Sequence, residues 1–138
     1  MDVNGEWYNE LGSKMVLRVN GATITGKYQT KVGDADGLYD LVGRISVPAD
    51  DNRTIGFVVA WQNDKRQTDS LTAWSGEVRE VSGTQSITTT WLLTIETTPD
   101  NDWKSTLIGK DLFTRLPPSL ESIKQASAVR GPSHHLDA

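Results

Sequence analysis

Three residues of the stretch 69–75 combine hydrogen-bonding groups with a large aromatic surface. If the stretch forms a strand, Ser70, Thr72 and Trp74 lie on one face, because side chains alternate between the two faces of a strand. Two hydroxyls beside an indole suit an amphipathic small molecule better than a neighbouring sheet. Further tryptophans stand near strand-like runs with polar neighbours: Trp61, Trp91 and Trp103. The alternative is that they anchor the core of a small β domain, since tryptophan is highly buried on average.

A carboxylate inside a strand-like run, Asp111, is the other group that could bind a ligand. It shares a parity with Trp103, Ser105, Leu107 and Gly109 in the run 103–111. A carboxylate that faces the interior must be paired or hydrogen-bonded. Either it accepts N–H bonds from a buried ligand, or it pairs with a polar side chain of the next strand. Asn9 is a candidate partner, because the last strand of a closed barrel returns to the first.

The sequence lacks the residue combinations that catalysis or metal binding requires. It contains no cysteine, which excludes disulfides, thiolate metal sites and a cysteine nucleophile. No histidine lies in the strand-like region, and no GxSxG, HExxH or P-loop pattern occurs. The adjacent His134 and His135 are too few to hold a metal, and we expect a solvated pair. We therefore predict a protein that is not an enzyme and has no metal site and no cofactor.

Length and charge restrict the class of protein further. A chain of 138 residues is long enough for one domain with one core. The formal net charge is -4, and the 14 lysines and arginines are scattered, which argues against a nucleic-acid partner. No apolar run approaches the ~18 residues of a transmembrane helix, and the N-terminus lacks the charged and apolar regions of a signal peptide. We expect no membrane partner and no signal peptide in this chain.

Short runs rich in Thr, Val, Ile, Trp and Tyr, punctuated by Gly, Asp and Asn, are typical of an all-β chain. Eight such runs follow one another: Gly5–Leu11, Met15–Val19, Ala22–Tyr28, Leu38–Val47, Thr54–Gln62, Ser70–Val81, Gln85–Ile95 and Trp103–Arg115. Asn20-Gly21 is a strong signal for a type I′ hairpin turn. Even spacing favours an eight-stranded antiparallel up-and-down β-barrel, with room inside for one small ligand. A β-sandwich is the alternative, and it would need longer crossing connections.

The character of the chain changes after residue 116. Pro117 and Pro118 end the last strand-like run, and the residues that follow are polar without a strand period. Leu120, Ile123 and Lys124 have the spacing that starts a weak helical turn. We predict a barrel domain over residues 1–116 and a flexible C-terminal tail over residues 117–138.

Several motifs in register resemble those of the avidin/streptavidin family of biotin-binding proteins. They are Gly5–Ser13 (GEWYNELGS), Thr25–Tyr28 (TGKY), Val59–Trp61 (VAW), Ser70–Gly76 (SLTAWSG), Thr90–Thr94 (TWLLT) and Trp103–Asp111 (WKSTLIGKD). The resemblance covers about Gly5 to Thr114 and leaves the tail outside. It implies non-catalytic, high-affinity binding of biotin in the open end of the barrel, for sequestration of the vitamin. It also implies a bacterial, streptavidin-like protein that is secreted or periplasmic.

The resemblance assigns roles around the planar ureido ring of biotin. The ring carbonyl would accept hydrogen bonds from Asn9, Ser13 and Tyr28, which polarise it as an oxyanion hole does. The two ring N–H groups would donate to Asp111 and Thr30. Asp111 would also hold Asn9 in place, which links the parity argument to the family pattern.

The rest of biotin would meet fewer polar groups. Thr72 would contact the ring sulfur, and Ser70 would contact the carboxylate with help from the backbone around Gly33 and Asp34. The remaining walls would be apolar: Trp61, Trp74, Trp91, Leu11, Val32 and Leu93. The loop Thr30–Gly37 would act as a lid that expels water when it closes.

Trp103 has a separate implied role. In tetrameric members a tryptophan at this position caps the pocket of a neighbouring subunit, so the resemblance implies a homotetramer. Leu92 and Ile108 have the outward parity, and a subunit interface would cover them. The alternative is ordinary exposed hydrophobic residues on a monomer.

Two other binding functions are open on the residues alone. A lipocalin-like barrel for another small amphipathic ligand predicts an apolar interior, without Asn9, Ser13, Tyr28 and Asp111 in register. A carbohydrate-binding module predicts tryptophans on an exposed face and several carboxylates in loops.

Overall fold

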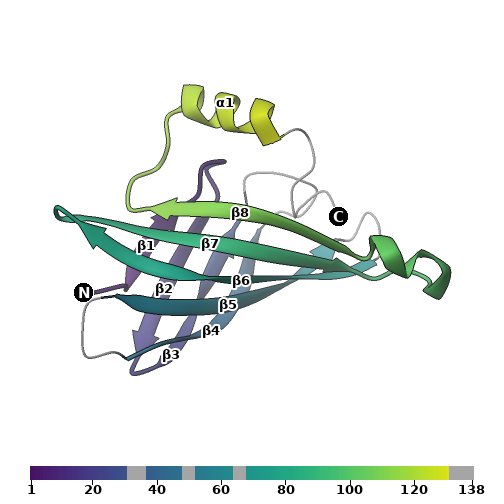
Figure 1. Cartoon of the computed structure of the whole chain (residues 1–138), viewed down its shortest axis with the longest axis horizontal. Helices are drawn as coiled ribbons and strands as arrows, with labels where there is room; N and C mark the ends of the chain where they lie inside the picture. The colour runs from purple at the N-terminus through teal and green to yellow at the C-terminus, as the bar shows by residue number, and fades with distance from the viewer. Residues whose placement is uncertain (31–36, 48–51, 64–67, 131–138) are drawn as a thin grey trace.

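The chain forms a closed barrel with an added C-terminal helix. The computed structural model describes residues 1–30, 37–47, 52–63 and 68–130, and gives no side-chain placement for 62, 63, 68, 129 and 130. The strands are β1 (Gly5–Tyr8), β2 (Lys14–Asn20), β3 (Thr23–Gln29), β4 (Leu38–Ile45), β5 (Arg53–Asn63), β6 (Thr68–Val81), β7 (Thr84–Ile95) and β8 (Thr106–Thr114). A 3₁₀ helix, η1 (Pro99–Lys104), precedes β8, and α1 (Leu120–Arg130) follows it (Figure 1).

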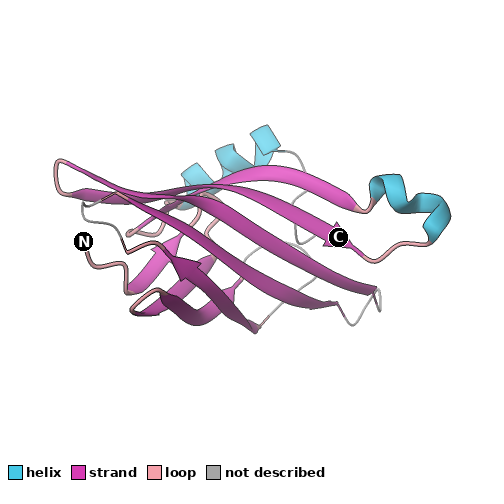
Figure 2. Ribbon diagram, turned by 60° about the horizontal axis from the view of Figure 1, so that its bottom comes forward, coloured by secondary structure: helices cyan, strands magenta, loops and turns pink. Residues whose placement is uncertain are grey.

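The predicted fold is confirmed. Each strand pairs with its neighbours in sequence, and β1 pairs with β8 through Tyr8 opposite Thr114, so the sheet closes. All of these pairings are antiparallel. Figure 2 shows the strands wrapping around one interior, with both helices outside the sheet. The residues of longer strands alternate between buried and exposed, as a filled barrel requires.

Tight turns join the strands where glycine permits them. Gly21 has φ 63°, but Asn20 ends β2 opposite Thr23, so the two-residue loop is Gly21-Ala22. Ala22 does not have a positive φ, so the predicted type I′ turn is wrong there, and glycine at the first loop position matches type II′. Ser82 and Gly83 do have positive φ values, 53° and 80°, between β6 and β7. The type I′ signature is therefore found in the β6–β7 hairpin and not in the β2–β3 hairpin.

Two of the differences between the predicted and the observed strand limits affect predicted site residues. β1 ends at Tyr8, so Asn9 and Leu11 lie in the turn before β2. Trp103 lies in η1 and not in a strand, because Pro99 and the acidic residues after it start a helical turn. The inward parity that was predicted for Trp103 is therefore wrong, whereas Asp111 of β8 is buried as expected.

Helix α1 occupies much of the segment predicted as a flexible tail. It lies outside the barrel beside β8 (Figure 1). Its sequence, LESIKQASAVR, is mostly polar and small. The mobility of the tail and its separation from the barrel domain stay predictions. In the described part of the chain, none of the helices is long and apolar enough to span a membrane.

An arginine ties the N-terminal segment to the end of β8. The Arg115 guanidinium lies 3.8 Å from the centroid of the Trp7 ring, which is fully buried. It donates hydrogen bonds of 2.8–3.1 Å to four acceptors: the backbone oxygens of Asp2, Asn4 and Glu6, and Gln85 Oε1. A planar guanidinium suits this site, because it can stack on a ring and donate in several directions at once.

We expect Arg115→Met to lower the free energy of unfolding by about 2–4 kcal/mol, since bonds from a charged donor and a cation–π contact are both lost. Urea denaturation of the two proteins measures the difference. Arg115→Lys is the control. It keeps the positive charge but not the planar guanidinium with its several N–H donors, so it should recover less than half of the lost unfolding free energy. Equal stability of Arg115→Met and the parent would contradict this role.

Candidate ligand-binding site

The predicted ligand-binding residues gather at one end of the barrel. In an up-and-down barrel the last residues of odd strands and the first residues of even strands lie at the same end. Tyr28 lies near the end of β3 and Trp61 near the end of β5, while Ser70 and Thr72 lie near the start of β6. Asn9 and Ser13 flank the turn between β1 and β2 at that end. Topology therefore places these side chains together, although they come from distant parts of the sequence.

Asn9 is held by its own turn. Its side-chain oxygen accepts hydrogen bonds from the backbone N–H groups of Leu11 and Ser13, at 3.0 and 2.9 Å. Its side-chain nitrogen donates to the Tyr28 hydroxyl over 3.4 Å. Asn9, Ser13 and Tyr28 are each almost fully buried. The amide is thus oriented with its N–H groups toward the barrel interior, where they can donate to a ligand carbonyl.

Tyr28 stays a neutral donor over a wide pH range. Burial raises the pKa of its phenol well above the usual value of 10, and the negative charge of Asp111 acts in the same direction. A hydrogen bond with Ser13 acts the other way and lowers the pKa. A protonated phenol can donate to an acceptor on a ligand, which a phenolate cannot.

This raised pKa predicts a loss of stability at alkaline pH. Below about pH 10 the phenol is protonated in both states and its contribution is constant. Above it, unfolded chains release the proton and folded ones retain it, so stability falls by up to ~1.4 kcal/mol per pH unit. Urea denaturation between about pH 9 and 11 should show a smaller slope for Tyr28→Phe than for the parent. Identical slopes would show that Tyr28 titrates normally.

Aromatic rings form a cage around these polar groups. Tyr28 stacks on Trp74 at 5.2 Å between centroids and meets Trp61 edge-on at 5.5 Å. The ring centroids of Trp61 and Trp74 are 6.4 Å apart, and Phe57 stacks against Trp74 at 5.0 Å. Trp61, Trp74 and Trp91 are each at most 5 % exposed. Such burial does not match the exposed tryptophan platform of a carbohydrate-binding module.

Two indole N–H groups bind polar side chains of the interior. Trp61 Nε1 donates to Thr72 Oγ1 at 2.8 Å, and Trp74 Nε1 donates to Asp111 Oδ2 at 2.9 Å. Trp74 and Asp111 belong to β6 and β8, so their bond passes across β7, the strand between them. The sequence predicted a partner for Asp111 and proposed Asn9; the bond found here is to an indole that was assigned only to the wall.

Thr89 is a buried polar residue that the sequence reasoning missed. It lies opposite Asp111 in the β7–β8 register, and its hydroxyl donates to the backbone oxygen of Asp111 at 2.9 Å. Thr89 has the same parity on β7 as the buried Trp91 and Leu93. This alternation in the sequence could have identified Thr89 as an inward-facing residue. Gly109 lies opposite Trp91, where an added Cβ would come within 2.1 Å of the indole. Glycine is therefore needed for Trp91 to lie over β8.

The remaining predicted residues divide into three groups. Leu11, Thr30 and Leu93 are buried, and Ser70 is partly exposed, as expected for a group near the mouth of a barrel. Trp103 is 82 % exposed on η1, apart from the buried tryptophans of its own chain. Val32, Gly33, Asp34 and the rest of the predicted lid from 31 to 36 lie outside the described residues, as do His134 and His135. Among the described residues, no group of three or more His, Cys, Asp or Glu side chains is arranged for a metal ion.

Comparison with known proteins decides the family. Residues 1–116 match the Avidin family. The chain belongs to the avidin family. Among curated relatives, avidin-related protein 4/5 of Gallus gallus is 36% identical over 125 residues, which cover 83% of this chain and 77% of that protein. Avidin of Gallus gallus is 30% identical over 127 residues, covering 83% and 78%, and afifavidin of Afifella pfennigii is 30% identical over 119 residues, covering 81% and 68%.

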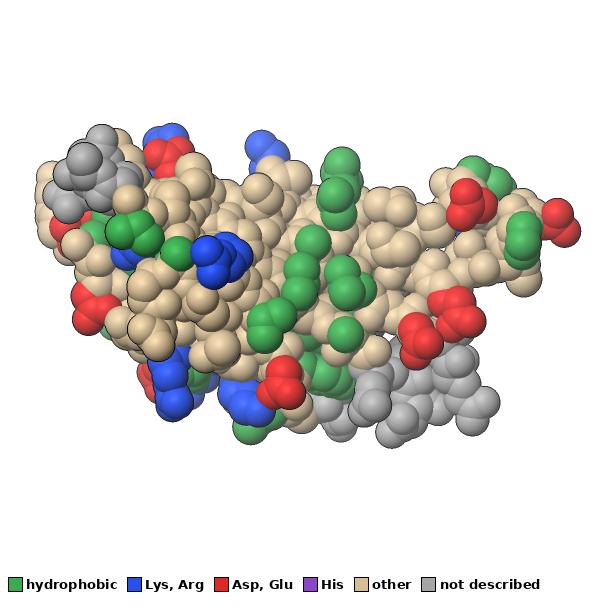
Figure 3. Space-filling view, turned by 90° about the horizontal axis from the view of Figure 1, so that it is seen from below, with side chains coloured by type: hydrophobic (Ala, Val, Ile, Leu, Met, Phe, Trp, Pro, Cys, Tyr) green, Lys and Arg blue, Asp and Glu red, His purple; other side chains and the backbone are tan. Residues whose placement is uncertain are grey.

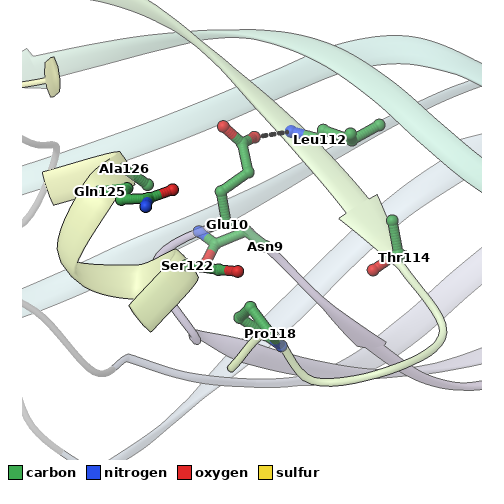
Figure 4. Close-up of a pocket in the computed structure, with 8 residues that line it drawn as sticks. All are labelled: Asn9, Glu10, Leu112, Thr114, Pro118, Ser122, Gln125 and Ala126. Atoms are coloured by element: carbon green, nitrogen blue, oxygen red, sulfur yellow. Dashed lines mark hydrogen bonds between the residues drawn. The ribbon is translucent and has the colours of Figure 1, made fainter. Parts of the chain in front are cut away.

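The avidin-family barrel carries a cavity on its outer side. It has a volume of about 410 Å³ and lies between α1 and the seam of β1 and β8, lined by Asn9, Glu10, Leu112, Thr114, Pro118, Ser122, Gln125 and Ala126 (Figure 4). The Glu10 carboxylate accepts a hydrogen bond from the Leu112 backbone N–H at 2.5 Å. This bond extends the seam beyond Tyr8, where β1 ends. Asn9 thus belongs to the barrel wall between the interior site and this cavity.

Proposed function

We propose that this avidin-family protein binds biotin, without catalysis, in the interior of its barrel. The observation that carries the proposal is a buried carboxylate, Asp111, enclosed with Asn9, Ser13 and Tyr28 in a cage of tryptophans. A cyclic urea is the complementary ligand, because its carbonyl accepts from several donors and its N–H groups donate to a carboxylate. An apolar ligand of the lipocalin type would offer these buried polar groups no hydrogen bond.

The contacts proposed for biotin are those that the family resemblance implies. Asn9, Ser13 and Tyr28 donate to the ureido oxygen, and Asp111 and Thr30 accept from the ureido N–H groups. Beyond the ring, Thr72 contacts the sulfur, and Ser70, nearer the mouth, contacts the carboxylate. Leu11 and Leu93 complete the walls with the tryptophans, and the resemblance assigns further contacts to Val32, Gly33 and Asp34, which lie outside the described residues.

We also propose that the protein is a homotetramer that works in a secreted or periplasmic location, where it sequesters the vitamin. Leu92 and Ile108 lie opposite each other on β7 and β8 and are 46 % and 72 % exposed, so their predicted outward parity is confirmed. Leu71 on β6 adds to the exposed apolar surface of neighbouring strands. Figure 3 shows that hydrophobic side chains also gather in the middle of the face it displays. Subunit contacts would remove such surface from water.

A thermal melt with and without excess biotin tests the proposal. Ligand at a thousand times its Kd adds about 4 kcal/mol to the native state. For a chain of this size that corresponds to a rise in Tm of more than about 10 °C. Biotin methyl ester is a useful second ligand, since it keeps the ring and loses only the charge that Ser70 meets. No shift with either ligand would overturn the proposal.

A further inference from the structure

Thr72 is enclosed by apolar side chains. It lies on the inner face of β6, opposite Val59 of β5 and Leu93 of β7 in the strand registers. All three residues are fully buried. Valine and leucine side chains offer no hydrogen-bond acceptor, so the Thr72 hydroxyl can donate to neither of them. A buried hydroxyl whose hydrogen finds no acceptor costs free energy.

The indole of Trp61 restricts the direction of that hydroxyl. A threonine hydroxyl has one hydrogen to donate and two lone pairs that accept. Trp61 Nε1 donates to one lone pair of Thr72 Oγ1 at 2.8 Å. An indole nitrogen has no acceptor capacity, so the hydroxyl hydrogen must rotate away from Trp61. The hydroxyl is thereby presented as a donor.

From this arrangement, and resting on the proposed binding of biotin, we infer that Trp61 is a positioning residue that makes Thr72 a dedicated donor to the ring sulfur. The pair then determines specificity for a ligand with an acceptor at that ring position. Trp61 thus has two separate effects: its ring contributes apolar wall for any biotin-like ligand, and its N–H selects among ligands through Thr72.

The inference predicts a preference between two closely matched ligands, biotin and its analogue with a methylene in place of the ring sulfur. Both keep the ureido ring, the bicycle and the chain. The parent protein should bind biotin about threefold to tenfold more tightly, the range expected for one neutral hydrogen bond. Competition against a fluorescent biotin conjugate measures this ratio directly for each variant.

Four variants separate the possible roles. Thr72→Val keeps the shape, and the ratio should fall to about one. Thr72→Ser keeps the hydroxyl and should retain the preference. Trp61→Phe should weaken both ligands through lost wall contact and also reduce the ratio by at least half. Trp91→Phe removes similar bulk from another wall and should weaken both ligands while it leaves the ratio unchanged.

The outcomes distinguish this inference from the function on which it rests. If the parent binds neither ligand, the proposed function fails. If the parent binds both but Trp61→Phe retains the full preference, Trp61 does not position Thr72 and the inference is overturned. A preference that persists in Thr72→Val also overturns it, and this arm remains decisive if Trp61→Phe does not fold. The inference is supported if Thr72→Val and Trp61→Phe lose the preference for biotin while Thr72→Ser and Trp91→Phe keep it.

Discussion

Asp111→Ala is expected to weaken biotin binding by about 2–5 kcal/mol, or roughly thirtyfold to several-thousandfold. The variant removes the charged acceptor proposed for the ureido N–H, and hydrogen bonds to ionised groups are the strong ones. It also removes the hydrogen bond that Trp74 Nε1 donates to Asp111 Oδ2 over 2.9 Å, in both the free and the bound protein. Calorimetric titration of folded Asp111→Ala with biotin gives the comparison.

Two controls show whether the carboxylate itself is responsible. Asp111→Asn keeps the shape and one oxygen acceptor but no charge, and it should fall between alanine and the parent. Thr89→Val removes only the hydroxyl that bonds the Asp111 backbone oxygen, so it should cost much less. If Asp111→Ala binds biotin as tightly as the parent, the ureido assignment is wrong.

Trp103→Ala is expected to accelerate biotin release by about thirtyfold or more, the effect of losing an aromatic hot spot at an interface. The residue lies on η1, which projects from one end of the barrel (Figure 1). An indole that is 82 % exposed in the single chain gains most when a second subunit covers it. The proposed arrangement places it over a neighbouring pocket, so ligand release and subunit association should change together.

The test combines a chase of labelled biotin with the molar mass in solution. Asp102→Ala, at the exposed position on η1 that precedes Trp103, is the matched control and should leave both readouts near the parent values. A parent that is monomeric, with release unchanged in Trp103→Ala, would contradict both the capping role and the tetramer.

The sequence predicted the structure correctly where the preference of each segment for a strand agrees with what the whole barrel requires. Alternation of apolar and polar residues, with glycine at the turns, specifies strands and leads to the barrel, because each strand must bury one face. The inward parity of Thr72, Trp74 and Asp111 follows from the same rule and is seen in their burial. The predicted start of the last strand, Trp103, is wrong. Trp103 and Lys104 fit the alternation of the strand that follows, but they belong to the 3₁₀ helix that begins at Pro99.

The contacts between distant residues could not be read from the pattern. The bond from Trp74 to Asp111 passes across β7 between strands that are not neighbours, and it depends on the side-chain rotamers. The bond from Trp61 to Thr72 is diagonal across the β5–β6 register, where Trp61 lies opposite Ser70. Parity shows which side chains face inward, but only the closed barrel shows which of them meet.

Calorimetric titration of the purified protein with biotin tests the central claim most directly. We predict saturation at one biotin per chain, with a favourable enthalpy from the buried polar contacts and a Kd of about 1 nM or below. Absence of binding heat, together with no biotin retained on the protein after gel filtration at about 100 μM ligand, would contradict it. In that case the buried polar groups would serve the barrel itself and not a urea-containing ligand.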